Sequence, residues 1–113
     1  MVDLDFESKF RNCIKKIEEI GNLYAEAKGQ SWQMQELKGS VLSSVMQRLG
    51  DIPVSKAEIE AKRSDDYQSH IRQTAEAIKK ELKLKSQYEM WKSSFEALRS
   101  LSSLEKATRQ LTE

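Results

Sequence analysis

The sequence predicts an all-α fold of two long helices that pair as a helical hairpin or coiled coil, joined through a short connecting helix. Apolar residues recur at alternating steps of three and four, the spacing of one helix face, and one strong reversal signal interrupts them. The 113 residues are 33% charged and 38% hydrophobic, so we expect one helical domain, 1–113, with more surface than core. Two such rods cannot cover their own apolar stripes, and we therefore expect a homo-oligomer.

The first helical segment is predicted over about 3–49. Its seam residues follow steps of 4, 3, 4, 3, 4 and 3: Phe6, Phe10, Cys13, Ile17, Ile20, Tyr24 and Ala27. The same phase continues through Ser31, Met34, Lys38, Val41 and Val45. Each glycine inside a helix costs about 1 kcal/mol relative to alanine, and Gly29 lies in the stretch AKGQSW. The segment is thus either one helix bent near 29–31 or two helices divided there.

A reversal is predicted over 50–55, in the stretch LGDIPVS. Gly50 is a helix stop, and Pro53 cannot continue a helix and restricts the residue before it. Ser55 is followed three residues later by Glu58, the spacing of a capping box. These signals predict a short helix over 56–63.

A long helix is predicted over about 65–111. Ser64 is a good N-cap, and Asp65 and Asp66 place acids in the first turn, where the helix dipole favours them. One apolar stripe is Ile71, Ala75, Ile78 and Leu82, and a second, shifted by about two residues, is Leu84, Tyr88, Trp91, Phe95 and Leu98. We expect the second stripe to form the core or the oligomer seam, with the phase shift rotating the apolar face between them.

Several function classes lack their sequence signals. The net charge of +1 argues against a strongly cationic DNA coat, and neither a catalytic motif nor a Cys/His cluster is present, so we expect no enzyme, no metal and no cofactor. Cys13 lies on the apolar stripe, as a packed thiol would. The acidic start MVDLDFESKF is unlike a targeting peptide, and no apolar run has the length of a membrane span. The expected location is the cytoplasm.

The stretch KKELKLKSQYEMWKSSF, residues 79–95, interleaves lysines with aromatic rings. Residues 79–99 carry six basic and three acidic side chains, a mild positive bias. The aromatic stripe is read as core in preference to a stacking platform, whereas the lysines suit either a solvated face or an edge that follows phosphates. The candidate nucleic-acid-binding residues are Arg63, Arg72, Lys79, Lys80, Lys83 and Lys85.

A pattern around the second helical half resembles small helical proteins of tailed bacteriophages and prophages. It consists of paired glutamates with an alanine, a Ser/Asp cap and a tyrosine: Glu58, Glu60, Ala61, Ser64 and Tyr67. A tryptophan followed by a basic residue comes later, as Trp91-Lys92 with Arg99 further on, and the stretch Tyr24-Ala25-Glu26-Ala27 comes earlier. The same layout resembles the UvsY-type recombination mediators, and the resemblance extends over about residues 20–105.

This resemblance implies a function in phage DNA recombination or repair. UvsY-type proteins are helical, form rings, bind single-stranded DNA and help to load a recombinase onto strands covered by a single-strand-binding protein. By resemblance, single-stranded DNA, a recombinase and a single-strand-binding protein are the expected partners, in the cytoplasm of a bacterial host. The alternative is a coiled-coil structural or adaptor protein that acts through protein–protein contacts alone.

Overall fold

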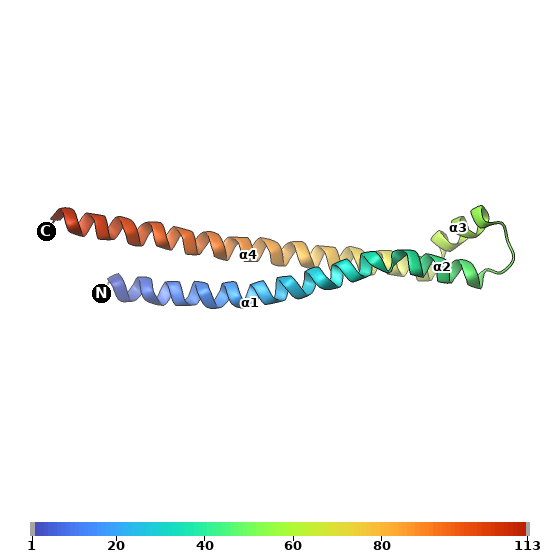
Figure 1. Cartoon of the computed structure of the whole chain (residues 1–113), viewed down its shortest axis with the longest axis horizontal. Coiled ribbons are helices and arrows are strands. Elements are labelled where there is room, and N and C mark those ends of the chain that lie inside the picture. The colour runs from blue at the N-terminus through green and yellow to red at the C-terminus, as the bar shows by residue number, and fades with distance from the viewer. Residues whose placement is uncertain (1, 113) are drawn as a thin grey trace. The chain divides into compact units, whose positions relative to one another are not determined.

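The fold is all-α, as predicted. The computed structural model describes residues 2–112, with side chains from Asp5 onward, and shows helices and no strand over this range. The helices are α1 (Val2–Glu36), α2 (Lys38–Arg48), α3 (Val54–Arg63) and α4 (Asp65–Thr112) (Figure 1). Helices α1 and α2 correspond to the first predicted segment, and α3 and α4 to the short and the long helix.

The first segment is interrupted at Leu37 and not at the glycine near its middle. Helix α1 continues through Gly29 and Ser31. Leu37 keeps near-helical angles of φ −76° and ψ −10°, and its N–H donates to the Gln33 carbonyl at 3.0 Å while its own carbonyl accepts from Val41 at 2.9 Å. The interruption is therefore slight, because the helical hydrogen bonds continue on both sides of it.

The reversal follows Gly50, as expected, but the start of α3 differs from the prediction. Gly50 has a φ of +79°, the left-handed conformation that glycine adopts most easily at a helix end. Helix α3 begins at Val54 with Pro53 as its N-cap, and among the described residues no side chain caps it. The predicted capping box of Ser55 and Glu58 is thus wrong, because the helix starts two residues earlier, directly after Pro53, and Ser55 lies inside it.

Ser64 ends α3 and starts α4 with one side chain. Its backbone is extended (φ −64°, ψ 151°), and its hydroxyl donates to the Ala61 carbonyl at 2.6 Å. The same oxygen accepts the Tyr67 N–H at 3.2 Å, which is the N-cap bond that the sequence predicted.

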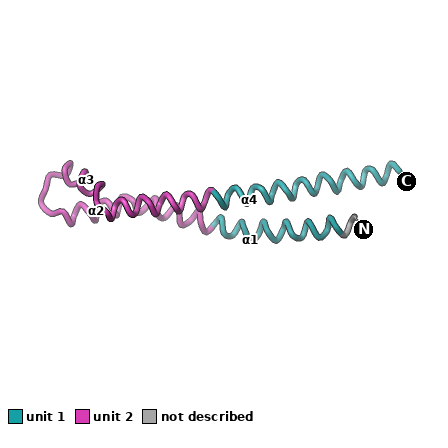
Figure 2. The backbone as a smooth tube through the Cα atoms, turned by 180° about the vertical axis from the view of Figure 1, so that it is seen from behind, with its two compact units in different colours: residues 1–25, 83–113 teal, residues 26–82 magenta. Residues whose placement is uncertain are grey.

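The chain divides into two compact units. Unit 1 joins Met1–Ala25 with Lys83–Glu113, and unit 2 is Glu26–Leu82. In unit 1 the first part of α1 lies antiparallel to the second part of α4 (Figure 2). The seam residues of this pair are half-buried, apart from Cys13, which is only 4% exposed.

Unit 2 has more helices to bury its side chains. Its buried residues are mostly small and lie on all its helices: Ala27, Ser31, Val45, Ala57, Ala61, Tyr67 and His70. Helix α3 packs against α2, and an ion pair of 2.7 Å joins Arg48 of α2 to Asp66 at the start of α4. Small side chains at the contacts let the helix backbones approach closely.

The seam of α4 keeps one heptad phase, contrary to the predicted shift. Of the predicted upstream stripe, Ile71 and Ile78 are half-buried, whereas Ala75 and Leu82 are exposed. The inward positions follow steps of three and four throughout: Tyr67, His70, Thr74, Ala77, Glu81, Leu84, Tyr88, Trp91, Phe95 and Leu98. The polar members conceal this phase from a hydrophobic pattern. Two of them have hydrogen-bond partners: Thr74 donates to the His70 carbonyl at 2.8 Å, and His70 Nε2 lies 2.8 Å from the Met34 carbonyl oxygen.

We expect Ser64→Ala to lower the free energy of unfolding by about 1 kcal/mol, because the Tyr67 N–H loses its N-cap acceptor. Urea denaturation followed by circular dichroism measures the change. Ser86→Ala, at an exposed position inside α4, is the control and should change stability by less than about 0.5 kcal/mol. Equal effects of the two substitutions would show that the Ser64 cap contributes nothing.

Candidate nucleic-acid interface

All six candidate cationic residues are exposed. Arg63 lies on α3 and the other five lie on α4. Unit 2 holds Arg63, Arg72, Lys79 and Lys80, and unit 1 holds Lys83 and Lys85. The candidate set therefore does not form one compact cluster.

Helical spacing groups part of the set on one face of α4. Arg72 and Lys79 are seven residues apart, and Lys83 follows four residues after Lys79, so these three lie on the same outward side. Lys80 lies next to this face, while Lys85 lies on the opposite side of the α4 seam. We call Arg72, Lys79, Lys80 and Lys83 the cationic face.

In the part of the chain that the structure describes, the cationic face forms no ion pair, a property that other exposed lysines such as Lys15 and Lys28 share. Seven other cations of this part do form ion pairs: Lys9, Arg11, Lys16, Arg48, Lys62, Arg99 and Arg109. Lys62 shows the effect of pairing, because its hydrogen bond to Glu58 raises the pKa of its ammonium above the ordinary 10.5. A cation with no carboxylate partner can contact a phosphate without first breaking an ion pair.

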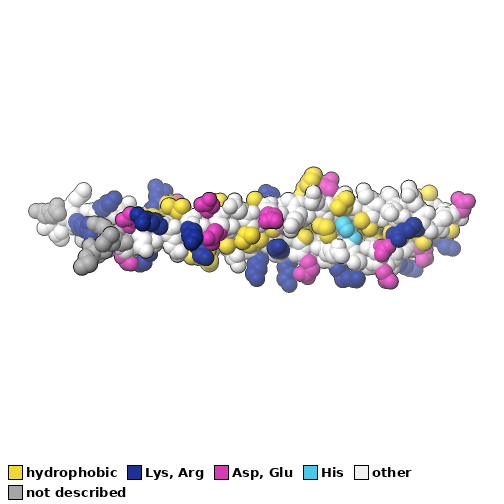
Figure 3. Space-filling model, turned by 90° about the horizontal axis from the view of Figure 1, so that it is seen from below, with side chains coloured by type: hydrophobic (Ala, Val, Ile, Leu, Met, Phe, Trp, Pro, Cys, Tyr) yellow, Lys and Arg dark blue, Asp and Glu magenta, His cyan; other side chains and the backbone are white. Residues whose placement is uncertain are grey.

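The surrounding surface is mixed in sign. Figure 3 shows lysine and arginine side chains among aspartate and glutamate side chains along the face in view. On α4 itself Glu76 lies on the cationic face, four residues after Arg72 and four before Lys80, and Glu81 is half-buried in the seam. The positive potential is therefore local to the cationic face and moderate in strength.

The predicted aromatic stripe packs against α1 of the same chain. The rings of Phe95 and Phe10 meet edge to face with centroids 5.4 Å apart, and those of Tyr88 and Tyr24 lie 5.9 Å apart. Tyr88 also lies over Gly21, where an added Cβ would come within 3.1 Å of the ring. Leu84, Trp91 and Leu98 are half-buried on the same side of α4, so all five predicted seam residues face the α1–α4 pair.

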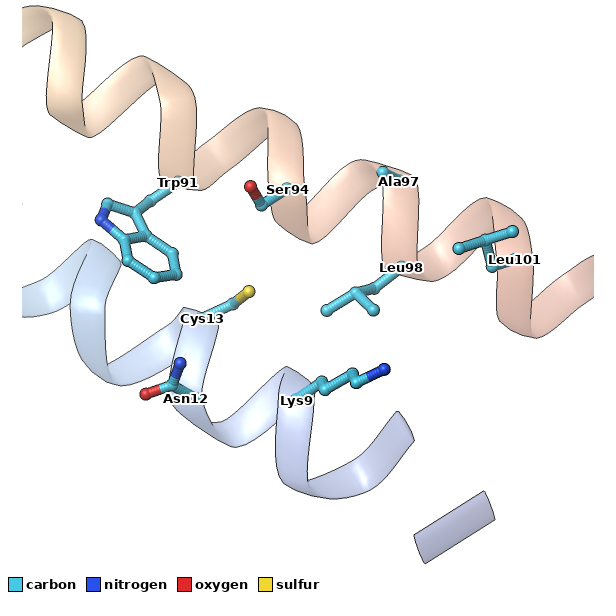
Figure 4. Close-up of a pocket in the computed structure, with 8 residues that line it drawn as sticks. All are labelled: Lys9, Asn12, Cys13, Trp91, Ser94, Ala97, Leu98 and Leu101. Atoms are coloured by element: carbon cyan, nitrogen blue, oxygen red, sulfur yellow. The ribbon is translucent and has the colours of Figure 1, made fainter. Parts of the chain in front are cut away.

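A shallow groove of about 360 Å³ runs beside this seam in unit 1. Trp91 and Leu98 of α4 and Cys13 of α1 form its floor, with the Cys13 sulfur directed towards α4 (Figure 4). Lys9 and Asn12 line its α1 side, and Ser94, Ala97 and Leu101 its α4 side. Its lining is mostly apolar, and Lys9 is the charged residue among the side chains that line it.

His70 has a structural position in unit 2. Its imidazole is 8% exposed, and Nε2 lies 2.8 Å from the Met34 carbonyl oxygen of α1. This bond ties α4 to α1 and satisfies a polar group in the middle of the seam.

An uncharged strip on α4 was missed by the sequence predictions. It flanks the seam and follows the heptad spacing: Gln87, Met90, Ser94, Ala97, Leu101, Leu104, Thr108 and Leu111. Met90, Leu101 and Leu104 are 56%, 53% and 64% exposed. The signal that reveals it is the absence of charge at these positions and not their hydrophobicity, because three of the eight are polar.

The chain matches no protein-family model, no curated protein and no solved structure. Within residues 2–112, no group of three or more His, Cys, Asp or Glu side chains has the arrangement of a metal site. None of the helices described is both long and apolar enough to cross a membrane.

We expect the two tryptophans to respond differently to truncation. Trp91→Ala should lower the free energy of unfolding by about 1.5–3 kcal/mol, because the indole packs on α1 beside Cys13. Trp32→Ala should change it by less than about 0.5 kcal/mol, because that side chain is 62% exposed. Chemical denaturation of both variants measures the difference, and an unchanged stability of Trp91→Ala would contradict a packing role.

Proposed function

We propose that the protein is a phage-type accessory factor of DNA recombination or repair that binds single-stranded DNA without sequence preference. It acts as a homo-oligomer and assists a recombinase on strands that also carry a single-strand-binding protein, in the cytoplasm of a bacterial host. The proposal makes it a binding protein and not an enzyme. The observation that carries it is the cationic face of α4, four exposed cations that pair with no carboxylate in the described residues.

Such a face suits a phosphate backbone. Each phosphate contact releases condensed counterions, so several weak contacts add up to measurable affinity at low salt. The mixed charge of the surrounding surface limits this affinity for one chain. Association of several copies on one strand multiplies it, because later contacts are made at a high effective concentration.

Base stacking would need an exposed ring, and the seam aromatics do not supply one. Tyr88 and Phe95 contact Tyr24 and Phe10 of α1, so their faces are engaged inside the chain. Trp32 is 62% exposed and belongs to unit 2, as do Arg72, Lys79 and Lys80. Trp32 lies on α1, however, and no described contact places its ring beside the cationic face of α4, so the proposal rests on phosphate contacts alone.

A second candidate is a coiled-coil structural or adaptor protein that never contacts nucleic acid. The uncharged strip of α4 favours it, because its large exposed side chains, such as Leu101 and Leu104, suit another helix and not phosphates. The two candidates differ in a single measurement, the binding of single-stranded DNA at low salt.

We expect the triple substitution Lys79→Gln, Lys80→Gln and Lys83→Gln to weaken binding of single-stranded DNA and to flatten its salt dependence. Each phosphate contact contributes about −0.7 to the slope of log K against log salt concentration. Loss of three contacts should therefore make this slope less negative by about 2. Fluorescence anisotropy of a labelled oligonucleotide over a salt series measures both quantities.

The matched control is the triple substitution Lys15→Gln, Lys28→Gln and Lys38→Gln, which removes the same charge from exposed positions on α1 and α2. It should leave the slope nearly unchanged. Equal losses from both triple variants would mean that net charge alone attracts DNA. Undetectable binding by the wild-type chain at low salt would instead favour the adaptor function.

A further inference from the structure

The uncharged strip of α4 has the spacing of a second coiled-coil seam. Its eight residues, from Gln87 to Leu111, follow steps of 3, 4, 3, 4, 3, 4 and 3. This is the a/d spacing of a helix that contacts a neighbour along its length. The α1 helix already covers the adjacent seam of Tyr88, Trp91 and Phe95, so the strip is available for a different helix.

The charges of this part of α4 occupy one narrow stripe. Between residues 86 and 104 the charged residues are Glu89, Lys92, Glu96 and Arg99, at steps of 3, 4 and 3. They interact on their own stripe, since Arg99 pairs with Glu96 at 3.3 Å and the Lys92 ammonium lies 5.2 Å from the Tyr88 ring centroid. A helix with only one narrow charged stripe is typical of a helix covered on two sides.

The side chains of the strip are available for contact. Met90, Leu101, Leu104 and Leu111 are 53–88% exposed, although each is large and apolar. The Thr108 hydroxyl donates to the Leu104 carbonyl at 2.9 Å, which satisfies its polar group within the helix and leaves its methyl group to pack. Ser94, Ala97 and Leu101 also form the α4 wall of the groove in unit 1 (Figure 4).

We propose that this strip is the interface between two copies of the chain, which pair α4 against α4 in antiparallel orientation about a two-fold axis near position 99. This interface rests on the self-association part of the proposed function and not on DNA binding. A two-fold interface uses the same patch on both copies, and so the patch must be complementary to itself.

The order of large and small residues supplies this complementarity. The centre of the strip, midway between 87 and 111, is position 99. Antiparallel pairing about it places Ala97 opposite Leu101 of the second copy and Ser94 opposite its Leu104, and places Met90 opposite Thr108. Large residues thus meet small ones in these three layers, whereas the end layer pairs Gln87 with Leu111. In parallel pairing each residue would face the same residue of the second copy. Layers of two large side chains would then alternate with layers of two small ones.

The flanks of the strip do not oppose this pairing. On the side away from the seam its neighbours are Ser93, Ser100 and Ala107, none of which is charged. The 25 residues span about 37 Å at about 1.5 Å per residue, and a width of about 10 Å gives a patch of about 370 Å². An area of this size is that of a weak interface and not of a permanent one, so the dimer should depend on concentration.

The test is the mass of the full chain measured by light scattering over a range of protein concentrations. We expect the wild type to approach twice the chain mass of 13.0 kDa or a higher even multiple. Leu101→Glu should shift the midpoint of association at least tenfold towards higher concentration. Leu82→Glu is the matched control, because Leu82 is also 53% exposed on α4 but lies outside the strip, and it should leave the midpoint unchanged.

Disulfide trapping tests the orientation. In a Cys13→Ala background, a mixture of Ser94→Cys and Leu104→Cys chains should yield the mixed disulfide as the main product if α4 pairs antiparallel. Predominant self-linking of each variant would overturn the antiparallel arrangement. The strip would be overturned as the interface if the wild type had the mass of a single chain at all concentrations. Equal shifts of the association midpoint by Leu101→Glu and Leu82→Glu would also overturn it.

DNA anisotropy on the same samples separates this proposal from the proposed function. Association that survives in a chain that binds no DNA would remove the DNA-binding function and leave the interface in place. DNA binding by a chain that stays single would remove the interface and leave the cationic face in place.

Discussion

The structure of unit 1 depends on one constraint: a single helix covers only one side of its neighbour. The seam between α1 and α4 has the regular spacing and the aromatic contacts of a coiled coil, yet among its described side chains only Cys13 is buried. Rings as large as Phe95 and Trp91 remain half-exposed at its edges. The pair therefore gains only part of the burial energy that its side chains offer, and further burial requires another helix.

In unit 2 the additional helix that covers the side chains comes from the same chain. The reversal at Gly50 and Pro53 returns α3 against α2, and this additional helix buries small residues such as Ala57 and Ala61. Polar groups become acceptable in this better covered region once they have partners. His70 bonds to the Met34 carbonyl, and the Ser31 hydroxyl accepts a hydrogen bond from Gln35 at 3.0 Å. The two units therefore differ in how many helices cover the seam and not in their type of packing.

The α1 seam and the Ser64 cap could be predicted because each rests on local chemistry, an apolar period and a hydroxyl at a helix start. The phase of α4 between Tyr67 and Leu84 could not, since its inward positions include Thr74 and Glu81, while the more hydrophobic Leu82 faces outward. Packing against the rest of the chain decided these positions. Of the candidate site, exposure of the cations was predictable from charge, but their lack of ion pairs required the positions of the neighbouring carboxylates.

The charge of one outward face of helix α4 changes along the helix. The proposed DNA binding and the proposed self-association therefore use different parts of this face. The face carries four cations and Glu76 up to Lys83, and its strip carries no charge from Gln87 onward. Lys83 lies 16 residues before position 99, about 24 Å along the helix at about 1.5 Å per residue, so antiparallel pairing would hold the Lys83 residues of two copies about 48 Å apart. The cationic faces would then remain distinct, and a strand would gain from both only if it were long enough to span them. Self-association would in this way favour extended single strands over short ones without any base-specific contact.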